Sequence, residues 1–322
     1  MWLLAAFALP ASADDLLFVT TEAGTVDSYT GSGAYRGTVT LPGGNSVWEI
    51  ATSPGERWIF AIDSWSTLYA VNPTTFAITA GPGIGVNNFG SLSISADRAT
   101  ALYGAYNLYE YDTASLSLRS QVVSSANIGE VYASPDDTLV LTDQVSESAS
   151  YDTTNYANPW TQTALSDGQV VGVAYSGDGR YAVTAYQETD GDLFVSACRY
   201  ANSQQPPCDE LLVLAGGTAT VALAPSPFGP NFYVGTDDGV FSLLVAGDPT
   251  LVAVSPSSPF GGSDVRDVTV GQNLDVYVLY DDRIERYDHL GVNGTTLTSF
   301  TDGLFRWDIH TTRKPITSWG LC

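Results

Sequence analysis

The chain has 322 residues, with 12 Lys plus Arg against 35 Asp plus Glu and a formal net charge of -23 at pH 7. This charge excludes non-specific binding to nucleic acid or anionic lipid, which needs clusters of Lys and Arg, and it favours cationic partners. The many Gly and Tyr residues and the single Met favour strands and tight turns over helices. In the alternative interpretation, the acidity only keeps the protein soluble.

The first 13 residues form an apolar run that ends in Ala11-Ser12-Ala13. Such a run before an Ala-x-Ala site is typical of a secretory signal peptide. We therefore expect cleavage after Ala13 and an extracytoplasmic location: periplasmic, cell-surface or secreted. No later run reaches the roughly 18 apolar residues of a membrane-spanning helix. We expect residues 14–322 to form a single domain without a transmembrane segment.

One sequence motif recurs along the chain at intervals of about 40 residues, the period of propeller blades. An apolar strand ends in a Ser-Pro-Asp-Gly-like turn, a second apolar strand follows, and a later strand ends in Tyr-Asp-Thr. Clear copies begin at residues 50, 92, 131 and 173, and weaker copies begin at 223, 268 and 309. In the Tyr-Asp-Thr ends, at 111–113 and 151–153, we expect the Asp carboxylate to accept hydrogen bonds from the amides of the next turn. The repeats predict an all-β fold: a seven-bladed β-propeller of four-stranded antiparallel blades.

The two chain ends each supply part of one blade. Residues 16–21, 25–29 and 35–41 have the pattern of second, third and fourth strands, and no first strand precedes them. Residues 305–310 have the pattern of a first strand that no full blade follows. Pairing the two ends closes the ring and leaves no exposed sheet edge, so we expect a closing blade from 14–41 plus 305–310. Residues 313–322 receive no role.

Cys198 and Cys208 bracket a polar segment, a spacing that suits a disulfide across a protruding loop in an oxidising compartment. Metal binding by this pair is the weaker alternative, because no His or third Cys lies nearby in the sequence. Cys322, the last residue, is left over for a free thiol or an intermolecular link.

The segment 53–63 reads SPGERWIFAID and continues through 68–75, with further copies from 95 and 134. This phrase resembles the repeat of YVTN-type β-propellers, a WD40-like group, although the Gly-His and Trp-Asp marks of WD40 blades are missing. The resemblance spans most of the mature chain and implies an architecture more than a chemistry. Members of this broad group include surface-layer proteins, extracytoplasmic binding proteins and, in related seven-bladed families, lactonases.

Acidic residues recur at the start of the first strands, the end of the channel that we call the top. The position before the first apolar residue of each first strand holds Glu49, Ser91, Glu130, Gly172, Ala222, Asp267 and Asp308. Buried carboxylates without partners are costly, so the four acids should face the wet channel mouth, pair with Arg266 and Arg306, or hold a cation, with Ca²⁺ as the candidate metal. In the alternative interpretation, acids simply suit turns.

Aromatic residues offer a second ligand surface. Trp65, Phe89 and Tyr106 fall in loops of the top face, where rings can stack on sugars or apolar peptides, or can simply pack. The sequence holds no nucleophile elbow, zinc-protease motif or phosphate-binding loop. His310 near Asp308 fits an acid/base pair, but a lone His beside an Asp is more often structural.

These observations favour an extracytoplasmic scaffold that binds a protein, glycan or cation on its acidic top face. The alternatives are a lactonase-like, metal-dependent hydrolase that uses the channel carboxylates and a structural surface-layer component. The sequence assigns no catalytic residue, ligand identity or oligomeric state.

Overall fold

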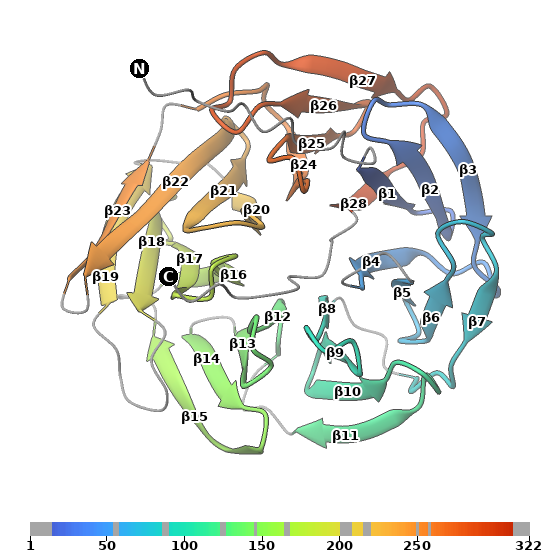
Figure 1. The fold of residues 1–322 in the computed structure, drawn as a ribbon, viewed down its shortest axis with the longest axis horizontal. Helices are drawn as coiled ribbons and strands as arrows, with labels where there is room; N and C mark the ends of the chain where they lie inside the picture. The colour runs from blue at the N-terminus through green and yellow to red at the C-terminus, as the bar shows by residue number, and fades with distance from the viewer. Residues whose placement is uncertain are drawn as a thin grey trace, which may run out of the picture.

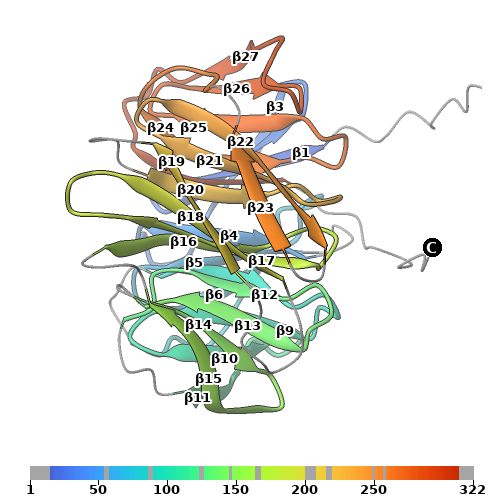
Figure 2. The ribbon, with the colours of Figure 1, turned by 90° about the vertical axis from the view of Figure 1, so that its left-hand side faces the viewer.

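The computed structural model describes residues 15–53, 58–85, 90–122, 127–144, 147–163, 168–199, 208–214, 220–248, 251–256 and 259–311. They form seven four-stranded antiparallel sheets arranged around a central axis (Figure 1). Seen from the side, the sheets make a disc-like body (Figure 2). The predicted seven-bladed β-propeller is confirmed. Among the described residues no helix is long and apolar enough to cross a membrane.

Six blades use four consecutive strands, and the innermost strand of each comes first in sequence. Blades two to four comprise β4 (Val47–Thr52), β5 (Ile59–Asp63), β6 (Leu68–Val71) and β7 (Ile78–Ala80); β8 (Leu92–Ile94), β9 (Thr100–Gly104), β10 (Leu108–Asp112) and β11 (Leu118–Val122); and β12 (Val131–Ala133), β13 (Leu139–Asp143), β14 (Glu147–Asp152) and β15 (Asn155–Thr163). Blades five to seven comprise β16 (Gln169–Tyr175), β17 (Tyr181–Gln187), β18 (Leu193–Arg199) and β19 (Cys208–Leu214); β20 (Thr220–Pro225), β21 (Asn231–Thr236), β22 (Gly239–Asp248) and β23 (Leu251–Pro256); and β24 (Val265–Val270), β25 (Val276–Tyr280), β26 (Arg283–Tyr287) and β27 (Thr295–Ser299).

The first blade joins the two ends of the chain. It combines β28 (Arg306–Thr311) with β1 (Leu16–Thr21), β2 (Thr25–Thr30) and β3 (Tyr35–Thr40). The antiparallel register places Val19 opposite Ile309, and both side chains are buried. The predicted closure is therefore confirmed. This pairing supplies the innermost strand of the first blade, so that blade also has four strands and the ring is closed.

The repeated turns are held by the residues that define the repeat. In four blades a Ser hydroxyl at the end of the first strand accepts the backbone N–H five residues later, at 3.0 to 3.1 Å, from Trp58, Thr100, Leu139 and Tyr181. In three of them the same hydroxyl donates to the Asp two residues on, at 2.6 to 2.7 Å. The Ser-x-Asp phrase thus satisfies a tight turn from its own side chains.

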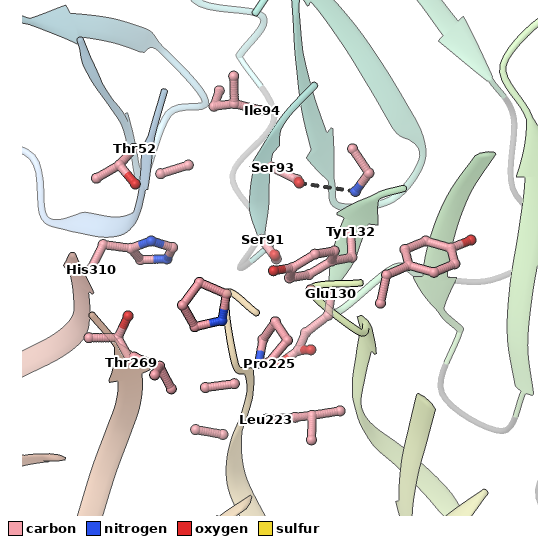
Figure 3. A pocket seen from close by; sticks show the side chains of 18 of the residues that line it. Thr52, Ser91, Ser93, Ile94, Glu130, Tyr132, Leu223, Pro225, Thr269 and His310 are labelled. Carbon is pink, nitrogen blue, oxygen red and sulfur yellow. Dashed lines mark hydrogen bonds between the residues drawn. The ribbon is translucent and has the colours of Figure 1, made fainter. Parts of the chain in front are cut away.

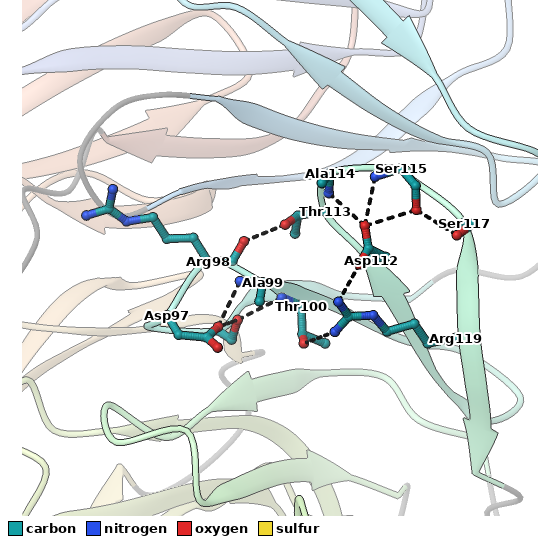
Figure 4. A network of polar contacts seen from close by, with 11 residues as sticks. Asp97, Arg98, Ala99, Thr100, Asp112, Thr113, Ala114, Ser115, Ser117 and Arg119 are labelled. Atoms are coloured by element: carbon teal, nitrogen blue, oxygen red, sulfur yellow. Dashed lines mark hydrogen bonds and ion pairs between the residues drawn. The ribbon is translucent and has the colours of Figure 1, made fainter.

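The Tyr-Asp-Thr ends also behave as predicted. Asp112 accepts the N–H groups of Ala114 and Ser115 at 3.0 and 2.8 Å, and it also pairs with Arg119 (Figure 4). Asp152 accepts the N–H of Thr154 at 2.7 Å. These carboxylates serve the turns, so they are not available to a ligand.

The apolar core lies between neighbouring blades. One cluster joins Phe60 and Ile62 of the second blade to Tyr103 and Tyr111 of the third, all at most 2% exposed. Similar clusters join the other neighbours. Because each blade buries its faces only against the next, the closing strand affects the stability of the whole ring.

Cys198 stands opposite Cys208 in the register of β18 and β19. Directly opposed residues of antiparallel strands have Cα atoms about 4.5 to 5.5 Å apart, within the range of a disulfide. The Cys208 side chain and residues 200–207 lie outside the described residues, as do residues 1–13 and Cys322. The disulfide and the signal peptide remain predictions.

Ile309→Ala should lower the free energy of unfolding by about 2 to 4 kcal/mol, because it removes a fully buried side chain from the closing strand. Leu290→Ala, at a side chain that is 69% exposed, is the matched control and should change stability by less than about 0.5 kcal/mol. Urea denaturation measures both. Equal stabilities would contradict the role given to β28.

Mass spectrometry of the unreduced protein should show one peptide cross-link, between Cys198 and Cys208. Closing this short loop should contribute about 2 to 3 kcal/mol, so a reductant should lower the melting temperature by several degrees. A freely alkylated Cys198 in the unreduced, denatured protein would rule out the bond.

Candidate cation site in the central channel

The acids predicted at the top of the first strands meet in one cavity. Glu49, Glu130, Asp267 and Asp308 come from four blades and all line a cavity of about 340 Å³ along the propeller axis. Figure 3 looks into this cavity, with His310 on one side and Glu130 and Tyr132 on the other. The predicted position of these acids at the channel is thus what the structure shows.

A β-bulge positions most of these side chains. The first-strand register shifts immediately before Glu49, Gly172, Ala222 and Asp267. In the closing blade, the shift falls between the pairs Val19–Ile309 and Thr21–Arg306, next to Asp308. A bulge adds one residue to a strand and re-aims the neighbouring side chain. The bulges therefore direct the side chains of Glu49, Asp267 and Asp308 toward the channel and the next blade.

Each of the four carboxylates links its own blade to the next one. The N–H of Ile50 donates to Asp308 Oδ2 at 2.8 Å, and the N–H of Val173 donates to Glu130 Oε2 at 3.0 Å. The N–H of Ile309 donates to Asp267 Oδ2 at 2.8 Å. Glu49 accepts from the backbone of Leu92 in the same way. The channel-facing N–H groups of an innermost strand have no further strand to bond with, so these carboxylates accept their hydrogen bonds.

Of the three aligned positions without an acid, Ser91, Gly172 and Ala222, Gly172 has a steric reason. A Cβ on Gly172 would lie 2.9 Å from the Cβ of Leu223, so this position has no room for a side chain. Ala222 has no side-chain acceptor for the N–H of Val268 in the following blade. Asp267, on the same strand as Val268, accepts that N–H through Oδ1 at 2.7 Å.

A second row of hydrogen bonds was not predicted from the sequence. The Thr52 hydroxyl donates to the carbonyl of Thr311 at 2.8 Å, and the Thr311 hydroxyl donates to the carbonyl of Val270 at 3.1 Å. Ser93 accepts the N–H of Ala133 at 3.1 Å (Figure 3). These residues follow the acid position by two or three residues, so alignment of the first strands over their full length could have found them.

Burial and mutual repulsion raise the pKa values of the channel acids. Desolvation, followed by the charge of Asp143, raises the pKa of Glu130 to about 8. Desolvation and the neighbouring carboxylates raise the pKa values of Glu49 and Asp308 well above their usual range. The carboxyl groups of Asp267 and Asp308 share a hydrogen bond, which requires a proton on one of them.

The predicted pairing of these acids with two arginines is wrong. Arg266 forms two hydrogen bonds with Asp281, at 2.6 and 2.8 Å, and lies over the Phe305 ring. Arg306 is buried against the Phe300 ring and binds Asp302 at 2.8 Å. Arg266 lines the cavity, but its guanidinium group, like that of Arg306, binds a carboxylate and an aromatic ring that are not among the cavity-lining residues. This arrangement suits arginine better than a lone channel carboxylate.

The other residues predicted on the top face do not join the acids: one holds a turn together, and two are exposed on the surface. Asp63 accepts the N–H groups of Trp65 and Thr67 and serves its own turn. Trp65 and Tyr106 are 53% and 50% exposed on turns, and neither lines the channel cavity. Phe89 lies outside the described residues. The structure therefore separates the acids from the aromatics that were predicted beside them.

The cavity has two chemically different ends. The acids occupy the end where the first strands begin. Near the other end of those strands the lining mixes hydroxyl and apolar side chains, among them Ser134, Ser176, Pro135 and Phe228. Such a cavity suits a ligand with a positive group and an apolar body.

Glu130→Gln should stabilise the protein at high pH. The folded-state pKa of about 8 exceeds the unfolded value of about 4.3, so the folded protein holds a proton that the unfolded chain releases. Stability from this group is complete below about pH 4 and is lost as the pH rises through about 8. The Gln variant cannot ionise and keeps an acceptor for Val173, so at pH 9 its free energy of unfolding should exceed that of the wild type by up to about 5 kcal/mol.

Chemical denaturation at pH 5 and pH 9 measures this effect. The control is Glu22→Gln, since exposed Glu22 also accepts one backbone N–H, from Phe305. Its stability relative to the wild type should be the same at both pH values. A Glu130→Gln curve that parallels the control would show that Glu130 is not desolvated.

Sequence comparison finds no matching family model and no matching curated protein. Structure comparison finds many similar folds. A functionally unknown protein from Desulfotomaculum acetoxidans shares 13% identity at a TM-score of 0.71, with 94% of this chain and 99% of that chain covered. Hydrazine synthase from Kuenenia stuttgartiensis shares 12% at 0.65, covering 92% and 98%. The β-propeller domain of Cps50 (Swd1) from Myceliophteria thermophila shares 12% at 0.66, covering 81% and 88%. At these identities the likeness shows the fold alone: a seven-bladed β-propeller.

Proposed function

We propose that the protein is an extracytoplasmic binding scaffold of the YVTN-type repeat class that takes a small, positively charged ligand into its channel. The observation that carries the proposal is the convergence of four carboxylates from four blades on one cavity. Propellers commonly serve as interaction scaffolds, and this one places a cluster of four acids at the axis. The export that the proposal assumes rests on residues 1–13.

The form of the ligand follows from the cavity. Its volume of about 340 Å³ is in the range of small-molecule sites. The acids at the top would bind an ammonium or similar group, and Tyr132, Pro135 and Phe228 would contact a hydrocarbon or aromatic body. The half-buried Tyr132 lines the cavity and would offer its ring to a cation, while the buried Tyr175 packs against it in an edge contact, 6.5 Å between centroids.

Charge supports the same class of ligand. The formal net charge of -23 attracts cations over the whole surface, and clefts lined by one sign of charge concentrate the field. Arg266 lines the cavity but is paired with Asp281, and Arg306 is paired with Asp302, so neither pairs with a channel acid. A ligand cation would therefore offset the repulsion among carboxylates held close together.

A metal-dependent, lactonase-like hydrolase is the second candidate. The observation that favours it is His310, whose Nε2 lies 3.9 Å from Asp308 Oδ1 inside the same cavity. An imidazole beside a carboxylate can hold a metal or move a proton. Hydrolysis of a lactone by the purified protein, lost in His310→Ala, would favour this candidate over the scaffold.

Titration calorimetry with phenylethylamine and its neutral isostere phenylethanol tests the proposal. At pH 8.5, where more of the channel carboxyls are ionised, the amine should bind at least tenfold more tightly than the alcohol. A charge-assisted hydrogen bond contributes about 1.5 to 3 kcal/mol, and 1.4 kcal/mol corresponds to tenfold. The double variant Glu49→Gln/Glu130→Gln should lose this preference.

The matched control is Asp190→Asn, which removes an exposed carboxylate from the turn between β17 and β18. It should bind the amine as the wild type does. If the wild type does not distinguish the amine from the alcohol, or if the control loses the preference as fully as the channel variant, the proposed site is wrong.

A further inference from the structure

Three side chains with metal-binding atoms meet at one corner of the cavity. Glu49 comes from β4, and Asp308 and His310 come from β28 in the neighbouring blade. One ligand atom from each lies within 4.8 Å of the other two. Asp308 and His310 are two residues apart on one strand, so they project from the same face.

We infer that this corner binds a divalent transition ion of the Zn²⁺ class, held by Glu49, Asp308 and His310. The inference rests on the proposed function, since it specifies one cation that the acidic channel takes. An imidazole nitrogen with two carboxylate oxygens suits Zn²⁺ and similar ions. Ca²⁺, expected from the acids alone, prefers six to eight oxygen ligands, so His310 shifts the preference away from it.

The geometry needs a modest closure. Ligands of tetrahedral Zn²⁺ bind at about 2.0 to 2.2 Å, so two ligand atoms on one ion lie about 3.3 to 3.6 Å apart. The separation between His310 Nε2 and Asp308 Oδ1 is 3.9 Å, and the three ligand atoms all lie within 4.8 Å of one another. Side-chain rotation would have to bring these atoms closer by up to about 1.5 Å.

The surrounding structure orients the ligands. Asp308 Oδ2 accepts the N–H of Ile50 at 2.8 Å, which leaves Oδ1 on the side of His310. Asp267 is hydrogen-bonded to Asp308 and is itself fixed by the N–H groups of Val268 and Ile309. Such outer partners orient metal ligands and tune their affinity.

Three protein ligands leave coordination positions open. The remaining positions would face the cavity of about 340 Å³, which also reaches Glu130 and Tyr132. An ion here would therefore hold water or a ligand group, as sites with three protein ligands commonly do. A closed structural site would instead take a fourth side chain.

The experiment compares His310→Ala with His289→Ala in the full chain, produced without a histidine tag and treated with chelator. His289 is the other histidine of the sequence and is exposed in a turn of the seventh blade. Titration calorimetry at pH 7.5 with ZnCl₂ should give one site in the wild type and in His289→Ala. His310→Ala should weaken Zn²⁺ binding at least 100-fold, and CaCl₂ should bind the wild type at least 100-fold more weakly than ZnCl₂.

Co²⁺ gives a second measurement that does not depend on affinity alone. Its visible absorption should change on binding to the wild type and to His289→Ala, and the change should be absent in His310→Ala. His310→Gln, with its melting temperature measured beside it, shows that loss of the imidazole rather than of the fold is responsible. Zn²⁺ binding that survives in a folded His310 variant would overturn the inference.

Failure of this inference is distinguishable from failure of the proposed function. If phenylethylamine binds through the channel acids while Zn²⁺ does not bind, the metal site is wrong and the cation-binding scaffold stands. If neither binds, both are wrong. Tighter binding of Ca²⁺ than of Zn²⁺ would also overturn the inference, because it would show that His310 is not a ligand.

Discussion

The structure depends on how the innermost strands satisfy their channel-facing backbone N–H groups. The sheets end at these strands, and an unpaired buried N–H costs about as much as a lost hydrogen bond. Carboxylates from the preceding blade accept the N–H groups of Ile50, Val173 and Ile309. The same bonds hold neighbouring blades together. A structural requirement of the ring thus gathers acids at its axis.

This arrangement has an electrostatic consequence that leads to function. Carboxylates that are desolvated and close to one another repel, and their pKa values rise. A protein that needed only acceptors could use Ser, as it does where Ser93 accepts the N–H of Ala133. Four acids in one cavity are costly unless a proton or a cation offsets their charge. The proposed ligand and the proposed ion both do so.

The fold was predictable because its determinants are local. In the Ser-x-Asp turns and the Tyr-Asp-Thr ends, side chains accept hydrogen bonds from backbone N–H groups within a few residues. Each copy of the repeat can therefore form its turns from its own residues. The closing strand was predictable because the N-terminal segment has three strands without a first strand, and the C-terminal segment has a first strand without the other three. The partner of Arg266 was not, because Asp267 is its neighbour in sequence whereas Asp281 is 15 residues away. Only the folded structure brings the guanidinium group of Arg266 onto Asp281 and over the Phe305 ring.

The acids of the site were predictable from the sequence, whereas the direction of their side chains and the residues around them were less so. Four of the acids were found from one alignment position, but the bulges that aim them depend on register and are invisible in a single strand pattern. His310 was noted beside Asp308, whereas its approach to Glu49 requires two blades to meet. Trp65 and Tyr106 were placed correctly on turns, yet the structure sets them apart from the cavity.

A crystal structure at a resolution that shows ordered water would test the central claim most directly. The account predicts that the N–H groups of Ile50, Val173 and Ile309 each lie 2.7 to 3.2 Å from a carboxylate oxygen of the preceding blade. Side chains of Asp308, Glu130 and Asp267 turned away from the channel, with water on those N–H groups, would contradict it.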